Sequence, residues 1–164
     1  MLRAGFTALL TALLATVAAP ALAGVAEVSF VKSDQFSDIG RNVVDRERVL
    51  KRYDEHFQKL AQRLPDGQTL KVQVLDIDLA GELKPTFRHG DLRVLKGHVD
   101  WPQLKMHWDL VGPAGQTLQS GDERLSDMAY LVRTPRHAGF DGLAYDLRLV
   151  DEWFDKRFGA TAVQ

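Results

Sequence analysis

Residues 43–79 read VVDRERVLKRYDEHFQKLAQRLPDGQTLKVQVLDIDL, which is a helical pattern, a break and a strand pattern in succession. The helical pattern is a seven-residue recurrence of large apolar side chains, at Val43, Leu50, Phe57 and Leu64. A Pro-Asp-Gly break ends it, and the alternation over residues 70–79 predicts a strand with both faces partly covered. This order indicates a domain in which helix and sheet form separate layers.

The flanking sequence extends this plan in both directions. Residues 25–31 before the helix, and residues 91–96, 104–110 and 116–123 after it, carry strand patterns. A second amphipathic helix is predicted over residues 143–158. The order β-α-β-β-β-β-α predicts an α+β fold of two layers, a mostly antiparallel sheet of about five strands with two helices on one face. The β-α-β start favours one parallel strand pair. The predicted core includes Phe57, Leu60, Trp108 and Phe154.

Composition excludes several classes of protein. The 164 residues include 21 Lys and Arg, 22 Asp and Glu, and no cysteine, which leaves a formal charge of −1. Disulfides, cysteine zinc sites and cysteine nucleophiles are therefore excluded. The balanced charge gives no general attraction to nucleic acid. Because no nucleotide-binding glycine motif or serine nucleophile elbow occurs, we predict no cofactor and no nucleic-acid partner.

The first residues have the pattern of a secretory signal peptide. A positive Met-Leu-Arg start is followed by an apolar run from Gly5 to Ala19 and by Ala21-Leu22-Ala23. The run is shorter than the roughly 20 residues that a membrane-spanning helix needs. We therefore predict cleavage after Ala23, a signal peptide at 1–23, a single α+β domain at 24–164, no transmembrane segment after cleavage, and a periplasmic location.

The segment from Asp76 to Glu82 is the most suggestive of chemistry. In an extended chain the carboxylates of Asp76 and Asp78 project from the same face, where they could bind a hard cation. Alternatively, these acids form structural ion pairs across a long loop at residues 80–90, with Asp76 or Asp78 pairing with Arg88 or Arg93. The candidate ligand site or polar cluster comprises Asp76, Asp78, Glu82, Arg88, His89, Asp91 and Arg93.

Several segments spread along the chain resemble a family of bacterial exported proteins known as a domain of unknown function. They are Val28-Ser29-Phe30, residues 36–40 (FSDIG), 76–82 (DIDLAGE), 91–94 (DLRV), Trp101-Pro102, residues 125–130 (LSDMAY) and Trp153-Phe154. The resemblance implies an envelope protein of Gram-negative bacteria and implies no activity, so no catalytic residue is assigned.

Three functional hypotheses follow. The first is an exported, non-catalytic binding or accessory domain for an envelope protein or a small ligand. The second is a small metal-dependent hydrolase that uses Asp76, Asp78, Glu82 and a histidine such as His89. The third is a structural envelope factor that associates through a sheet edge or its surface. Bound metal would distinguish the second hypothesis from the first, and self-association would support the third.

Overall fold

The structure is a computed structural model that describes residues 23–86, 90–97, 99–132 and 142–159. Its strands are β1 (Val25–Phe30), β2 (Thr69–Asp78), β3 (Glu82–Thr86), β4 (Gly90–Val94), β5 (Gln103–Val111) and β6 (Thr117–Ser126). Its helices are α1 (Val43–Ala61) and α2 (Ala144–Phe158), with short 3-10 turns η1 (Ser33–Gln35) and η2 (Tyr130–Val132). Residues 1–22 of the predicted signal peptide lie outside the described residues.

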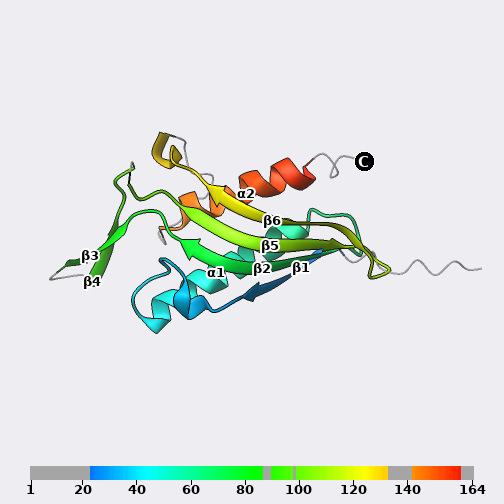
Figure 1. Ribbon diagram of the computed structural model, residues 1–164, viewed down its shortest axis with the longest axis horizontal. Helices are drawn as coiled ribbons and strands as arrows, with labels where there is room; N and C mark the ends of the chain where they lie inside the picture. The colour runs from blue at the N-terminus through cyan, green and yellow to red at the C-terminus, as the bar shows by residue number, and fades with distance from the viewer. Residues whose placement is uncertain (1–22, 87–89, 98, 133–141, 160–164) are drawn as a thin grey trace, which may run out of the picture.

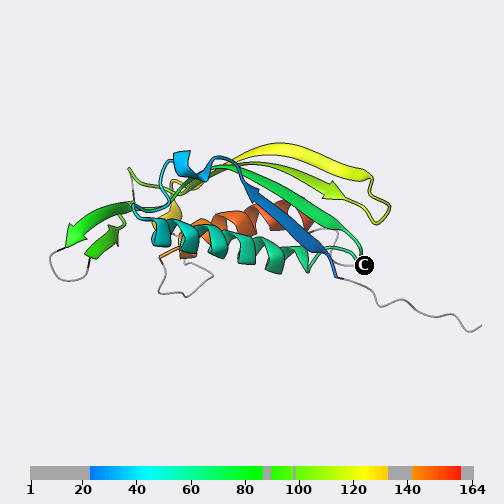
Figure 2. The same cartoon turned by 90° about the horizontal axis from the view of Figure 1, so that it is seen from below.

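The main sheet has the strand order β1-β2-β5-β6 (Figure 1). The β1–β2 pair is parallel and the other two pairs are antiparallel, as the β-α-β start predicted. Both helices cover one face of this sheet, seen in Figure 2 as cyan α1 and orange α2 on the same side of the strands. The predicted α+β class is therefore confirmed.

The core lies between the sheet and the two helices. Phe57, Leu60, Trp108 and Phe154 are at most 4% exposed, which confirms the predicted core positions. Helix α1 begins where expected, because the Asn42 side chain accepts a hydrogen bond from the backbone N–H of Asp45 at 2.8 Å. Burial of the apolar stripe of each helix provides most of the stability of this layer.

Strand β2 contains a β-bulge that the alternation of the sequence does not reveal. The pairing with β5 shifts between Val74 and Asp76, so that Leu75 and Asp76 both lie away from the core. Ile77 consequently joins Val74 on the buried face, and Leu75 is 45% exposed. The prediction that both faces of this strand are partly covered is wrong for that reason.

A strand pair projects from one end of the molecule. Residues Glu82–Thr86 form β3 within the expected 80–90 loop and pair with β4 as a separate antiparallel hairpin. Figures 1 and 2 both show this hairpin extending beyond the main sheet. The expected loop is therefore largely a strand, and the structure has one strand more than the sequence predicted.

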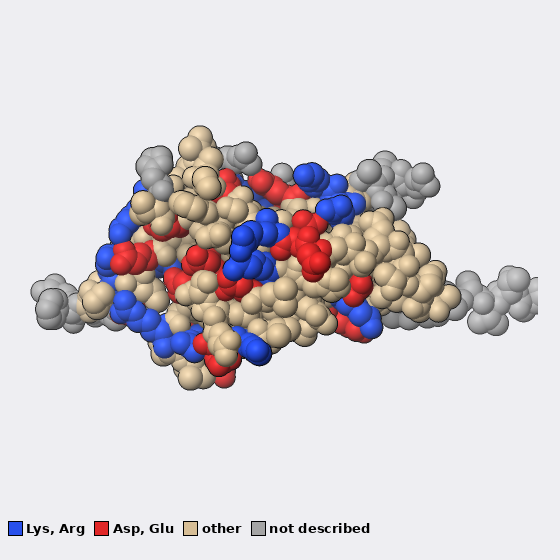
Figure 3. Space-filling model, viewed as in Figure 1, with Lys and Arg blue, Asp and Glu red and all other residues tan. Residues whose placement is uncertain are grey.

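The face seen in Figure 1 carries both signs of charge in small groups (Figure 3). Lys71 pairs with Glu27 at 3.3 Å, and the imidazole of His107 contacts the carboxylate of Asp122 at 2.8 Å. Neither α1 nor α2 combines the length and apolar character needed to cross a bilayer, and no other described helix does.

Candidate functional site

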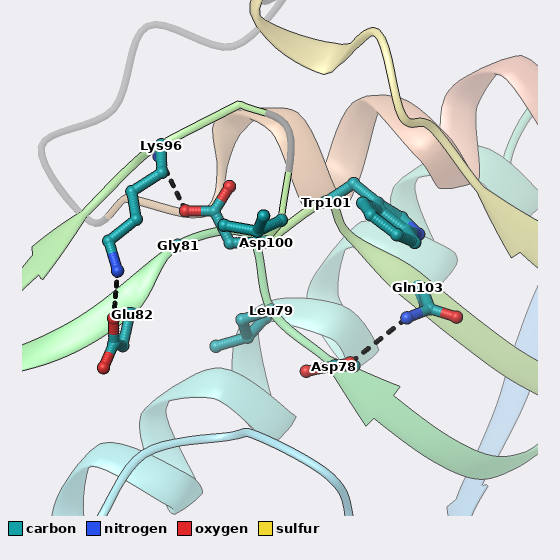
Figure 4. A pocket seen from close by; sticks show the side chains of 9 residues that line it. Asp78, Leu79, Gly81, Glu82, Lys96, Asp100, Trp101 and Gln103 are labelled. Atoms are coloured by element: carbon teal, nitrogen blue, oxygen red, sulfur yellow. Dashed lines mark hydrogen bonds and ion pairs between the residues drawn. The ribbon is translucent and has the colours of Figure 1, made fainter.

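A pocket of about 330 Å³ lies at the base of the hairpin, between the β2–β3 connection and the segment leading into β5 (Figure 4). We call it the base pocket. Its polar lining residues are Asp78, Glu82, Lys96, Asp100 and Gln103, and its apolar lining residues are Leu79, Val99 and Trp101. A pocket of this volume is typical of a binding site for a small molecule.

The hairpin is attached to the body of the protein by Arg93 of β4. Its guanidinium forms two hydrogen bonds to the carboxylate of Asp38, at 2.8 and 3.2 Å. Nη1 also donates to the backbone carbonyls of Ala80 and Gly81, at 3.3 and 2.8 Å. A two-stranded hairpin has little stability alone, so these bonds fix the direction in which it projects.

The two aspartates of β2 have different surroundings. Asp76 accepts hydrogen bonds from Lys105 Nζ at 2.7 Å and from the backbone and hydroxyl of Ser37. Burial opposes ionisation of Asp76, but these bonds outweigh it and lower the pKa of its carboxyl. Asp78 instead accepts a bond from the neutral amide of Gln103 at 3.2 Å. The pKa of Asp78 is raised. Burial is the largest cause, and the negative charges of Asp38 and Asp76 add to it.

The opposite side of the base pocket is held by Asp100. Its carboxylate accepts hydrogen bonds from the backbone N–H groups of Lys96 and Gly97 and from the Tyr130 hydroxyl, at 2.6 to 2.8 Å. Burial works against ionisation, yet these three bonds lower the pKa of Asp100. Nearby, Glu82 is bonded to Lys84 and Lys96, and those bonds lower its pKa to about 2. Both carboxylates are therefore ionised at neutral pH.

The structure does not bring the candidate residues from the sequence together in one cluster. Asp78 and Glu82 line the base pocket, whereas Asp76 lies on the outer face of the sheet. Asp91 contacts Arg41, with 3.5 Å between the carboxylate and the guanidinium. The residues with no structural placement are Arg88 and His89, which lie outside the described part of the chain.

The predicted pairing of Arg93 with Asp76 or Asp78 is wrong. Arg93 pairs with Asp38, because the loop after η1 runs beside the end of β2 and forms a parallel bridge between Asp38 and Asp78. The carboxylate of Asp76 turns to Lys105, its direct neighbour in the β2–β5 register. Within the described residues, no group of three His, Asp or Glu side chains is placed to hold a metal ion.

Comparison with known families gives one match. DUF3016, a protein family of unknown function, matches residues 24–156. The chain belongs to this family. No curated protein and no solved structure gave a match. Membership in a family of unknown function, as the resemblance implied, is confirmed.

The resembling segments of this DUF3016 domain come together around the hairpin base. Residues 36–40 supply Asp38, residues 91–94 supply Arg93, and residues 125–130 supply Tyr130. The candidate residues predicted from the sequence did not include Asp38, Asp100, Trp101, Gln103 and Lys105. Two of these residues could have been found from the sequence, because Asp38 and Trp101 lie in segments that resemble the family.

Proposed function

We propose that this DUF3016 protein is an exported, non-catalytic binding domain that holds a small organic cation in the base pocket. The cation is a primary ammonium or guanidinium group with a short organic body. The observation that carries the proposal is an unbalanced carboxylate, Asp78, in a preformed pocket whose lining also includes the indole ring of Trp101.

The imbalance follows from counting the charges at the end of β2. Burial and the charges of Asp38 and Asp76 raise the pKa of Asp78, and the charges of Arg93 and Lys105 lower it by less. Arg93 is bonded to Asp38 and Lys105 to Asp76. Among the described residues, the hydrogen-bond partner of Asp78 is a neutral amide. A bound cation would relieve the repulsion at Asp78.

The rest of the pocket supports an organic cation. Lys96 is bonded to Glu82, so the one Lys or Arg among the described lining residues is already paired, and Asp100 adds a second negative charge. Trp101 is half-buried and lines the same pocket, where an indole face attracts ammonium and guanidinium groups within about 6 Å. A bare metal ion needs several converging oxygen ligands, and no described group of side chains provides them.

Calorimetric titration of the purified protein with putrescine and with agmatine tests this proposal. We expect saturable binding of at least one of the two, weakened by added salt, and no binding of neutral butanediol. Asp78→Asn should lower the affinity by about 10-fold or more, because a hydrogen bond to a charged group contributes about 1.5–3 kcal/mol. Trp101→Leu should lower it by a smaller factor.

The matched control is Asp122→Asn on β6. Asp122 has an 85% exposed side chain and does not line the base pocket, so its variant should bind as the wild type does. No saturable binding of either amine, or equal binding by Asp78→Asn and the wild type, would overturn the proposal. Preferential binding of Mg²⁺ or Ca²⁺ would favour the metal-dependent alternative instead.

Export is the other part of the proposal. The positive start, the apolar run and the Ala21-Leu22-Ala23 end support a cleaved signal peptide and a periplasmic location. Expression of the full chain in a Gram-negative host should yield a periplasmic product whose mature N-terminus is Gly24. Intact-mass measurement of the fractionated product checks this. A product that keeps residues 1–23 and sediments with membranes would contradict it.

A further inference from the structure

We propose that Asp146 of α2 is a proton-linked positioning residue, which holds the β2–β3 hinge in place when its buried carboxyl is neutral and loosens the hinge when it is charged. The hinge is Ala80 and Gly81, the last two residues of the connection between β2 and β3. The inference extends the proposed function, because Gly81 of this hinge also lines the base pocket.

The hinge backbone is held from several directions. The carboxylate Oδ1 of Asp146 accepts the Ala80 N–H at 2.9 Å, and the backbone carbonyl of Asp100 accepts the Gly81 N–H at 2.9 Å. Arg93 Nη1 donates to both hinge carbonyls. Gly81 has φ +85°, a conformation that favours glycine, and its added Cβ would lie 2.9 Å from the carbonyl oxygen of Val94. The turn from β2 into β3 is therefore sharply defined.

Asp146 occupies an unusual position for a carboxyl group. Its side chain is fully buried, and Oδ2 has no hydrogen-bond partner among the described residues. A buried carboxylate with one unpartnered oxygen is costly, whereas the neutral acid keeps the Ala80 bond through Oδ1. Burial accordingly raises the pKa of Asp146 to about 7.

Among the described residues, charged and titratable groups from three parts of the fold act on Asp146. Tyr53 of α1 is buried beside it, and burial together with the charge of Asp146 raises the pKa of Tyr53. Asp38, from the loop before α1, opposes ionisation of Asp146, whereas Arg93 of β4 favours it. The hydrogen bonds from the N–H groups of Ala80 and of Asp146 itself also favour the charged form, by less than burial opposes it. Arg93 is the one cation in this set, and its bonds to Asp38 and the hinge carbonyls already hold it.

Loss of the proton to solvent therefore creates competition for Arg93. A charged Asp146 attracts the guanidinium that anchors the hairpin, and it also favours entry of water beside Oδ2. Either response weakens the bonds at the hinge carbonyls. Burial raises the pKa of Asp146 in the folded protein above its ordinary value of 3.8, so the stabilisation is complete below about pH 4 and is lost as the pH rises through about 7.

Carbon-13 NMR of the Asp146 carboxyl in the purified, ligand-free protein tests the inference directly. We expect a titration midpoint between about pH 6 and 8. Hydrogen exchange should show β3 and β4 amides about 10-fold less protected at about pH 8.5 than at pH 6, after correction for intrinsic exchange. Asp146→Asn imitates the neutral acid and should keep the hairpin protected at both values, and its Tm should exceed that of the wild type increasingly as the pH rises.

The matched control is Asp34→Asn, which removes an exposed acid on η1 and should leave the pH dependence of hairpin protection unchanged. A wild-type midpoint below pH 5 would overturn the inference, and this measurement needs no variant to fold. The same pH dependence in Asp146→Asn and the wild type would also overturn it. Because these measurements use no ligand, they separate failure of the hinge mechanism from failure of cation binding.

Discussion

Phe154→Ala is expected to lower the free energy of unfolding by about 3–5 kcal/mol. Phe154 is 1% exposed on α2, and its ring packs at 4.9 Å from that of Phe158 and 6.3 Å from that of Trp153, between centroids. Truncation to alanine removes this apolar area from the core and leaves a cavity that the helix cannot close without moving. Urea unfolding followed by tryptophan fluorescence measures the change.

Phe57→Ala provides a second measurement from the other helix. Phe57 is fully buried on α1 and contacts the same Trp153, with 6.3 Å between ring centroids, so a loss of similar size is expected. Val132→Ala is the matched control, because that side chain is 86% exposed and its truncation should change stability by less than about 0.5 kcal/mol. Losses below about 1 kcal/mol for both phenylalanines would contradict the described packing of helices on the sheet.

Asp127→Asn is expected to cost about 3 kcal/mol, the second large effect. Asp127 pairs with Arg148, whose side chain is 3% exposed. The amide of asparagine can still accept the Ala129 N–H but cannot balance the buried guanidinium. Glu152 lies 3.4 Å from Arg148, and its side chain is 35% exposed. Because this carboxylate still balances part of the charge, it limits the loss of stability. Chemical unfolding of the variant at neutral pH gives the value.

A double variant separates a lost pair from a buried unpaired charge. Arg148→Met in the Asp127→Asn background removes the guanidinium as well, so most of the lost stability should return. Nη1 of Arg148 already has no hydrogen-bond partner among the described residues, which favours recovery with an apolar side chain. A double variant less stable than Asp127→Asn would show that Arg148 stabilises the fold by packing rather than through this ion pair.

The two-layer fold was predictable because its signals are local. The periodicity of α1 and the alternation of β5 identify which side chains are buried, and the Asn42 cap marks where α1 begins. Strand β3 was not predictable in this way. Its sequence, ELKPT, contains a proline and only one large apolar residue, and the strand exists because β4 pairs with it.

The candidate site was predictable only in part. Asp78 and Glu82 stood out because acids cluster along one short segment, and both line the base pocket. The partner of Arg93 depends on where the loop after η1 passes, which is a tertiary contact between residues 55 positions apart. In the sequence, Asp146 is an acidic residue in the first turn of a helix, which is a common position for an exposed acid. It is buried because α2 packs against the hinge, and this is a tertiary contact that the sequence does not reveal.

The bulge in β2 also affects how members of this family can diverge. Before it, Leu70, Val72 and Val74 belong to the core, so a substitution there must conserve volume. After it, Asp76 and Asp78 lie off the buried face, although they continue the same strand. Mutations can therefore replace these two side chains without repacking the interior. A relative can keep the scaffold intact while carrying different side chains, and thus a different local charge, at the end of this strand.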